Sequence, residues 1–227
     1  MAKETLKAQL SPASTSRLIR VAWLAVLLGL GIEIVLVALS AGFGNFKEVK
    51  PVVADLVQKI SWSVFVCIGV AFGTAVSNGR AAIGGFVGFL SGPVAFQAAK
   101  SMHKAATQAL DLPASIARPA PLFLAILKAL EYGCLGAYLA WLSKRPRRSV
   151  SDYVFGGLAT GVLFGGIFSI ALVEVSPSLS AGNLIGRIAN EFLHPIGCAL
   201  VVFTAEILGK RADPAAASPT ELPSPRP

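Results

Sequence analysis

Residues 21–46 read VAWLAVLLGLGIEIVLVALSAGFGNF, and this stretch decides the fold class because Glu33 is its only charged residue. A transmembrane helix needs about 20 mostly apolar residues, so the stretch is long enough to cross a bilayer. The run is too long for the apolar part of a signal peptide and is interrupted by the glutamate. We therefore expect an uncleaved first span.

The composition of the whole chain supports the same class. Of its 227 residues, 54% are hydrophobic and 14% are charged, about half the charged share of ordinary soluble domains. A soluble fold of this size could not bury so much apolar surface. Disorder over most of the chain is excluded, because disordered chains are poor in apolar residues. We predict an all-α integral membrane protein embedded in the lipid bilayer.

Five further apolar stretches of suitable length follow the first. The six predicted transmembrane helices are residues 21–46, 60–79, 81–99, 119–143, 153–173 and 184–205. Trp23, Trp62 and Trp141 lie near the ends of these stretches, where indole side chains favour the membrane interface. Residues 47–59 mix charges with valine and leucine, and we expect them to extend the second helix or to lie along the interface.

The basic residues predict the orientation. They are more frequent in the tails and connections on the side of the N-terminus, above all in the cluster KRPRR at 144–148. This bias predicts a bacterial-type inner-membrane protein with both termini cytoplasmic. The net charge of +8 lies mainly outside the apolar stretches, so we expect no nucleic-acid partner. Residues 1–16 form the predicted N-terminal tail, and the Pro-rich residues 212–227 form a disordered C-terminal tail.

Several short matches indicate an internal repeat. Residues 69–73 (GVAFG) resemble residues 161–165 (GVLFG), and the third and sixth spans both begin with Gly-Arg-x-Ala. The first and fourth spans each carry a central glutamate. We predict two three-helix repeats, residues 17–110 and 111–211. An odd number of spans per repeat gives the halves opposite orientations, and many transporters of this type bind solute between their repeats.

Ionisable residues in the apolar stretches are the candidate functional groups, because each costs about 2.5–3.5 kcal/mol at the centre of a span. Glu33 and Glu131 lie near the centres of their predicted helices. They are either cation or proton sites or buried partners that fix helix packing. Lys128 lies three residues before Glu131 and shares its helix face, so it either neutralises that glutamate or belongs to the same pathway.

The last apolar stretch contains the highest density of polar groups. Arg187, Glu191 and His194 share one helix face, and Pro195 removes a backbone donor beside them. A Glu-x-x-His pair can ligate a metal in a helical bundle. The chain has only one other histidine and no CxxC pair, so we expect no metal site, no cofactor and no disulfide framework. His194 is a proton-responsive group or a structural hydrogen-bonding group.

Two arginines begin predicted helices. Arg80 and Arg187 either extend to the lipid headgroups, or Arg187 pairs with Glu131 or Glu33. The residues predicted to form a solute or ion pathway are Glu33, Glu131, Lys128, Arg187, Glu191, His194 and Arg80.

Glycines recur four residues apart in three of the spans, a spacing that permits close packing of membrane helices. They provide packing surfaces or surfaces that slide during transport. The glycines predicted at helix contacts are Gly69, Gly73, Gly84, Gly88, Gly92, Gly157, Gly161 and Gly165.

Together these patterns predict a transporter or permease for a small solute or ion. Two alternatives remain. The chain could be a non-enzymatic binding or assembly subunit that acts with a partner subunit or as a homo-oligomer. It could also be a membrane-embedded enzyme that uses Glu191 and His194. The absence of phosphate-loop, HExxH and GxSxG motifs favours a non-enzyme.

Overall fold

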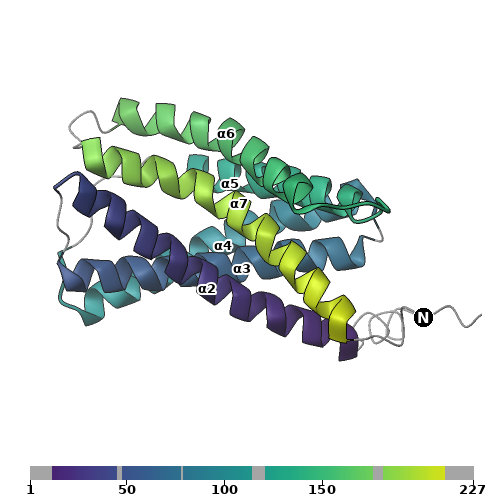
Figure 1. Cartoon of the computed structure of the whole chain (residues 1–227). Coiled ribbons are helices and arrows are strands. Elements are labelled where there is room, and N and C mark those ends of the chain that lie inside the picture. Colours follow the sequence, from purple (N-terminus) through teal and green to yellow (C-terminus); the bar gives the residue numbers. More distant parts are fainter. Residues whose placement is uncertain (1–11, 45–47, 78, 114–120, 176–180, 213–227) are drawn as a thin grey trace, which may run out of the picture.

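The computed structural model describes residues 12–44, 48–77, 79–113, 121–175 and 181–212. These residues form a bundle of helices and contain no strand (Figure 1). Most of the two predicted tails lies outside the described residues. The helices are α2 (Pro12–Gly42), α3 (Val49–Val76), α4 (Ala81–Ala109), α5 (Pro121–Leu142), α6 (Val150–Val175) and α7 (Ala181–Ala212).

All six of these helices are long and apolar enough to cross a membrane, which confirms the predicted number of spans. Their outer faces carry large apolar side chains that a soluble protein would bury. Trp23, Phe86, Phe155 and Ile170, for example, are each more than half exposed. Apolar surface of this kind faces lipid in membrane proteins. The fold is that of a multi-pass membrane protein.

Successive helices run in opposite directions, so the two ends of the bundle differ in the segments they contain. The beginning of α2 lies beside the end of α7 (Figure 1), where Arg20 donates a hydrogen bond of 3.4 Å to the carbonyl oxygen of Leu208. We call this the terminal end. At the distal end, α2 finishes and α3, α5 and α7 begin.

The connection between α5 and α6 is fixed at the terminal end by an ion pair. Arg148, the last residue of the basic cluster, lies 3.1 Å from the Glu206 carboxylate on α7. The hydroxyl of Tyr153 on α6 donates a second hydrogen bond of 2.9 Å to the same carboxylate oxygen. Glu206 thus holds the start of α6 and the basic connection against the end of α7.

Helix α3 begins earlier than its apolar stretch suggested. It includes residues 49–59, so the expected extension of the second helix is confirmed. The interface position expected for Trp62 was wrong: Trp62 is only 9% exposed and lies near the middle of α3. The reason is that the charged first three turns of α3 place this indole well inside the bundle.

Small residues bring α4 and α5 unusually close. Gly84, Gly88 and Gly92 lie on one face of α4, and a Cβ atom added to Gly88 would overlap the carbonyl oxygen of Tyr132 on α5. Gly136 is the corresponding glycine on α5, where an added Cβ atom would overlap the carbonyl oxygen of Gly84. Close backbone contact gives the two helices van der Waals packing energy. This matters in a membrane, because lipid provides no hydrophobic drive between helices.

The other predicted glycines lie at two further helix contacts. Gly69 and Gly73 face Ser91 and Val87 on α4, so they lie in the α3–α4 contact. Three glycines of α6 face α7, at Ile196, Phe192 and Glu191 in turn; these glycines are Gly157, Gly161 and Gly165.

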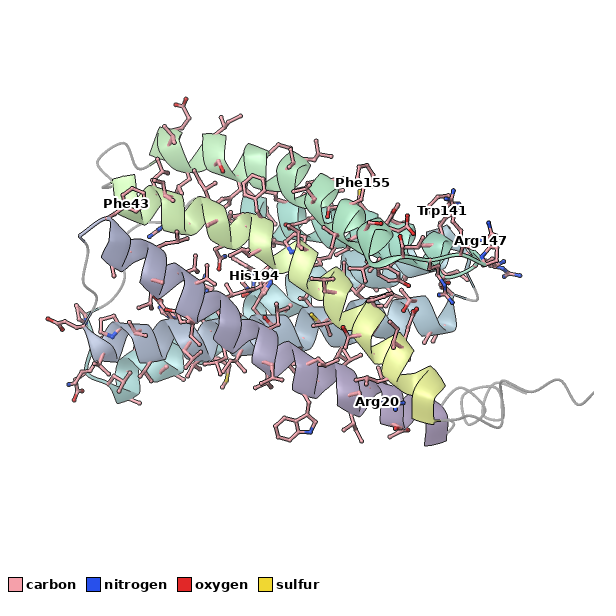
Figure 2. The ribbon with its side chains drawn as sticks, in the orientation of Figure 1. Arg20, Phe43, Trp141, Arg147, Phe155 and His194 are labelled. Atoms are coloured by element: carbon pink, nitrogen blue, oxygen red, sulfur yellow. The ribbon has the colours of Figure 1, made fainter. Side chains whose placement is uncertain are left out.

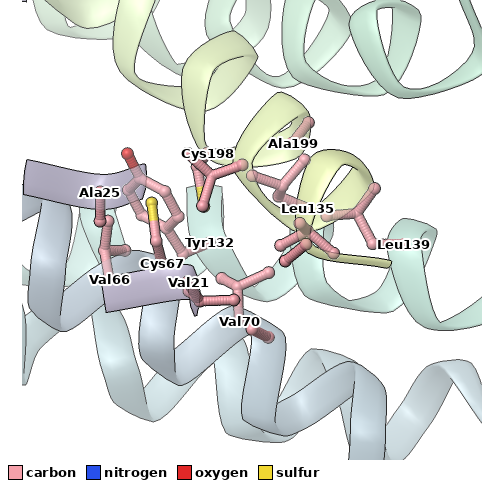
Figure 3. Close-up of a cluster of buried hydrophobic side chains, with 14 of the residues drawn as sticks. Val21, Ala25, Val66, Cys67, Val70, Tyr132, Leu135, Leu139, Cys198 and Ala199 are labelled. Atoms are coloured by element: carbon pink, nitrogen blue, oxygen red, sulfur yellow. The ribbon is translucent and has the colours of Figure 1, made fainter. Parts of the chain in front are cut away.

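An apolar core lies mainly in the half of the bundle nearer the terminal end, and Figure 3 shows part of it in close-up. It joins α2, α3, α5 and α7 through small and branched side chains with little or no exposure. Examples are Ala25, Val66, Leu135 and Ala199. We call this core the apolar layer. Its members are apolar, aromatic and cysteine side chains, whereas four buried charged residues, Glu33, Lys128, Glu131 and Glu191, lie toward the distal end.

Candidate functional site

A cavity of about 290 Å³ lies in the distal half of the bundle, and all six helices contribute to its wall. Its lining extends along α7 from Gly182, near the distal end, to His194, near the helix midpoint. The polar groups around it lie about 9–20 Å along their helices from the distal end, at the helical rise per residue. The cavity therefore reaches from near that end to about the middle of the bundle. Its main polar lining residues are Lys59, Lys128, Arg187, Asn190, Glu191 and His194.

Three charged side chains form a buried cluster on one wall of this cavity. The Lys128 ammonium lies 2.6 Å from the Glu131 carboxylate on its own helix, and it also pairs with the Glu191 carboxylate on α7. All three residues are less than 9% exposed. We call them the carboxylate–lysine triad. The ammonium joins α5 to α7 at a depth where an unpaired charge would be costly.

The two carboxylates of the triad differ in their access to the cavity. Glu191 lines the cavity, whereas Glu131 is completely buried and does not. Lys128 lies between them and also lines the cavity. Its Nζ atom is 5.6 Å from the centre of the Trp62 ring, within the range of a cation–π contact. The ammonium is therefore held by two carboxylates and an aromatic face.

A second ion pair lies at the cavity wall, between α2 and α3. The Lys59 ammonium of α3 is 2.7 Å from the Glu33 carboxylate of α2, and Glu33 is only 2% exposed. Lys59 lines the cavity, while Glu33 lies behind it. The two carboxylates predicted as pathway groups thus lie behind lysines that face the cavity.

His194 lies in the interior of the bundle (Figure 2), beside the Trp62 indole. Its Nδ1 atom is 3.0 Å from the backbone carbonyl oxygen of Asn190. A carbonyl can only accept, so Nδ1 donates and carries the hydrogen of the neutral ring. The other nitrogen, Nε2, is buried with no hydrogen-bond partner among the described residues. His194 therefore offers an unused acceptor at the cavity.

The two arginines predicted for the pathway lie in different places. Arg187 lines the cavity toward the distal end. Arg80 is exposed in the turn before α4, at the terminal end, and does not line the cavity. The ion pairs that hold Glu131 and Glu33 are formed by Lys128 and Lys59, where Arg187 was the predicted alternative.

Two residues of the site were not predicted from the sequence. Lys59 was expected in the extension of the second helix or along the interface, and Trp62 was expected at the interface, but both line the cavity. The apolar residues at 49, 52, 53, 56 and 57 were the available signal, because they recur at helical spacing and extend α3 across Lys59.

The described residues contain no group of three His, Cys, Asp or Glu side chains placed to hold a metal ion. The arrangement instead provides paired charges, hydrogen-bonding groups and aromatic walls around one small cavity. Comparison with family models, with curated proteins and with solved structures finds no match to this chain.

Proposed function

We propose that this protein is a permease for a small solute or ion, and that the cavity is its binding site. The observation that carries the proposal is the carboxylate–lysine triad, which places three buried charges beside a cavity at membrane depth. Charged groups inside a membrane are costly, and they commonly mark substrate and ion pathways. The volume suits a small ligand, since pockets for drug-sized molecules begin at about 300 Å³.

The proposal includes two inverted three-helix repeats, with the cavity between them. Each half supplies one carboxylate that lies behind the cavity wall, Glu33 on α2 and Glu131 on α5. Each of these pairs with a lysine that faces the cavity. This correspondence supports the repeat, although the first lysine comes from a neighbouring helix and the second from the same helix.

We also propose a bacterial-type inner membrane with both termini in the cytoplasm. The start of α2 and the end of α7 lie at the same end of the bundle. The basic cluster between α5 and α6 belongs to this terminal end, as the positive-inside rule requires of a cytoplasmic side. The cavity then reaches toward the outer face.

A flux assay with four small probes tests the permease. Purified protein is reconstituted in lipid vesicles, and light scattering follows the entry of glycine, sodium acetate, ammonium chloride or urea. These are a zwitterion, an anion, a cation and a neutral solute. We expect at least one to enter faster than in protein-free vesicles. We expect Glu33→Gln and Glu131→Gln each to abolish this gain, because each substitution removes a carboxylate that pairs with a cavity lysine.

Glu174→Gln is the matched control, because Glu174 is an exposed carboxylate at the end of α6. It should keep the wild-type flux. The permease hypothesis fails if all four probes enter at the protein-free rate, or if both test variants retain the gain. Absence of flux together with a stoichiometric partner in mild detergent would favour the assembly subunit.

A further inference from the structure

We propose that the carboxylate–lysine triad binds one exchangeable proton, held on the carboxylate of Glu131 or Glu191. The inference rests on the proposed permease, because it names the ion that the pathway handles. It arises from the charge balance of the triad and from its hydrogen-bonding capacity.

The triad holds more negative than positive charge. Lys128 supplies one ammonium, and Glu131 and Glu191 supply two carboxylates. Another buried carboxylate, Glu33, is paired with Lys59 at 2.7 Å. Two carboxylates around one ammonium leave an excess negative charge in a site shielded from water. One added proton makes the triad neutral, which removes the cost of burying that charge.

Hydrogen-bond acceptors are also in excess. The Lys128 ammonium has three N–H donors, of which one goes to Glu131, one to Glu191, and the remaining side of the group faces the Trp62 ring. The Oε1 atom of Glu131 is buried with no hydrogen-bond partner in the described part of the chain. An unpartnered oxygen is less costly in a neutral carboxylic acid than in a carboxylate. The geometry thus favours a protonated carboxyl group here.

Other charged and titratable groups lie around the cavity and the triad, and on α5 itself the buried Tyr132 directly follows Glu131. Helix α7 adds His194, whose Nε2 acceptor is unused, and Arg187 farther along the cavity. Helix α3 adds Lys59 and Asp55 at the cavity wall. On α2 the charged group is Glu33, which is paired with Lys59. On α4 the titratable group is His103, which lies 4.0 Å from Asp55. Helix α6 contributes only the apolar side chain of Phe168 to the described cavity lining.

These positions give the proton an entry route. Glu191 and His194 both line the cavity and lie one helical turn apart on α7. A proton from the cavity reaches either group directly. Glu131 lies behind Lys128, where the proton is out of contact with the cavity.

A proton fits this site better than a metal ion. A metal cation needs several oxygen ligands around it, and the ammonium of Lys128 already occupies the space between the two carboxylates. A proton needs only one oxygen. The described residues also place no three acidic, histidine or cysteine side chains together as ligands.

Infrared difference spectroscopy tests the proposal on purified full-length protein in detergent. Spectra are compared between mildly alkaline and mildly acidic buffer. We expect wild type to show the carbonyl stretch of a protonated carboxylic acid, with a shift in heavy water that marks an exchangeable proton. Glu131→Gln and Glu191→Gln should each abolish the band, because either substitution leaves one carboxylate paired with one ammonium. Glu174→Gln is the matched control and should retain the band.

Three results would overturn the proton site: no such band in wild type, a band that survives in both triad variants, or loss of the band on addition of sodium or potassium ions. The last result would assign the site to a metal cation. This experiment is independent of flux. A band without flux of any probe supports the proton site and contradicts the permease. Flux without the band supports the permease and contradicts the proton site.

Discussion

Replacing Lys128 with methionine should destroy most of the folded protein. The substitution keeps the length of the side chain but leaves Glu131 and Glu191 facing each other without a cation. Breaking a buried ion pair by removing one partner costs about 3–5 kcal/mol, a large part of the stability of a typical domain. We expect K128M to aggregate in gel filtration, or to unfold at a much lower temperature when melting is followed by tryptophan fluorescence.

The same reasoning predicts a rescue. In the triple variant K128M/E131Q/E191Q no buried charge remains in the triad, so the cost of burying two carboxylates without their cation is removed. The triple variant should therefore recover most of the lost stability while losing function. Lys104→Met is the matched control, since Lys104 is exposed on α4. A normal melting curve for K128M, or a triple variant no more stable than K128M, would show that the triad does not hold α5 to α7.

The second large effect is expected at the contact between α4 and α5. Gly88→Val introduces a branched side chain where a single Cβ atom already overlaps the Tyr132 carbonyl oxygen. Overpacking of this kind typically costs about 1–3 kcal/mol, and here the obstacle is backbone that cannot rotate away. The helices must separate, which also displaces Lys128, whose carbonyl oxygen lies against Gly92 one turn along.

Thermal unfolding and the yield of monodisperse protein measure this effect. Gly31→Val is the matched control, because nothing lies within 4 Å of a Cβ atom built at Gly31 on α2. We expect G88V to lose most of its folded yield and G31V to behave as wild type. Equal melting temperatures for the two variants would contradict the importance of this close contact.

The sequence alone predicted the fold class because lipid imposes a strong and local rule: a spanning helix needs a long apolar run. The sequence also allowed residues 47–59 to extend the second helix, and α3 does include residues 49–59. It did not predict contacts between helices, such as the ion pair of Lys59 with Glu33. Here the apolar side chains at helical spacing outweigh the few charges, because the ion pair with Glu33 satisfies the partly buried Lys59.

The candidate site was predicted in part for the same reason. Glu131 and Lys128 are three residues apart, so helix geometry predicts their contact from the sequence, and the structure contains it. The pairing of Lys128 with Glu191 joins residues 63 positions apart. No local sequence pattern predicts this contact, because it depends on how closely α5 and α7 approach each other.

The apolar layer has a kinetic consequence if the protein is a permease. The cavity lining ends near the middle of the bundle, where the packed side chains of the apolar layer on α2, α3, α5 and α7 begin. A solute can leave on the other face only after these helices part, so each turnover includes a rearrangement. Motions of that size take microseconds to milliseconds. Transport should then saturate with substrate concentration, as in a carrier, and remain far slower than diffusion through an open channel.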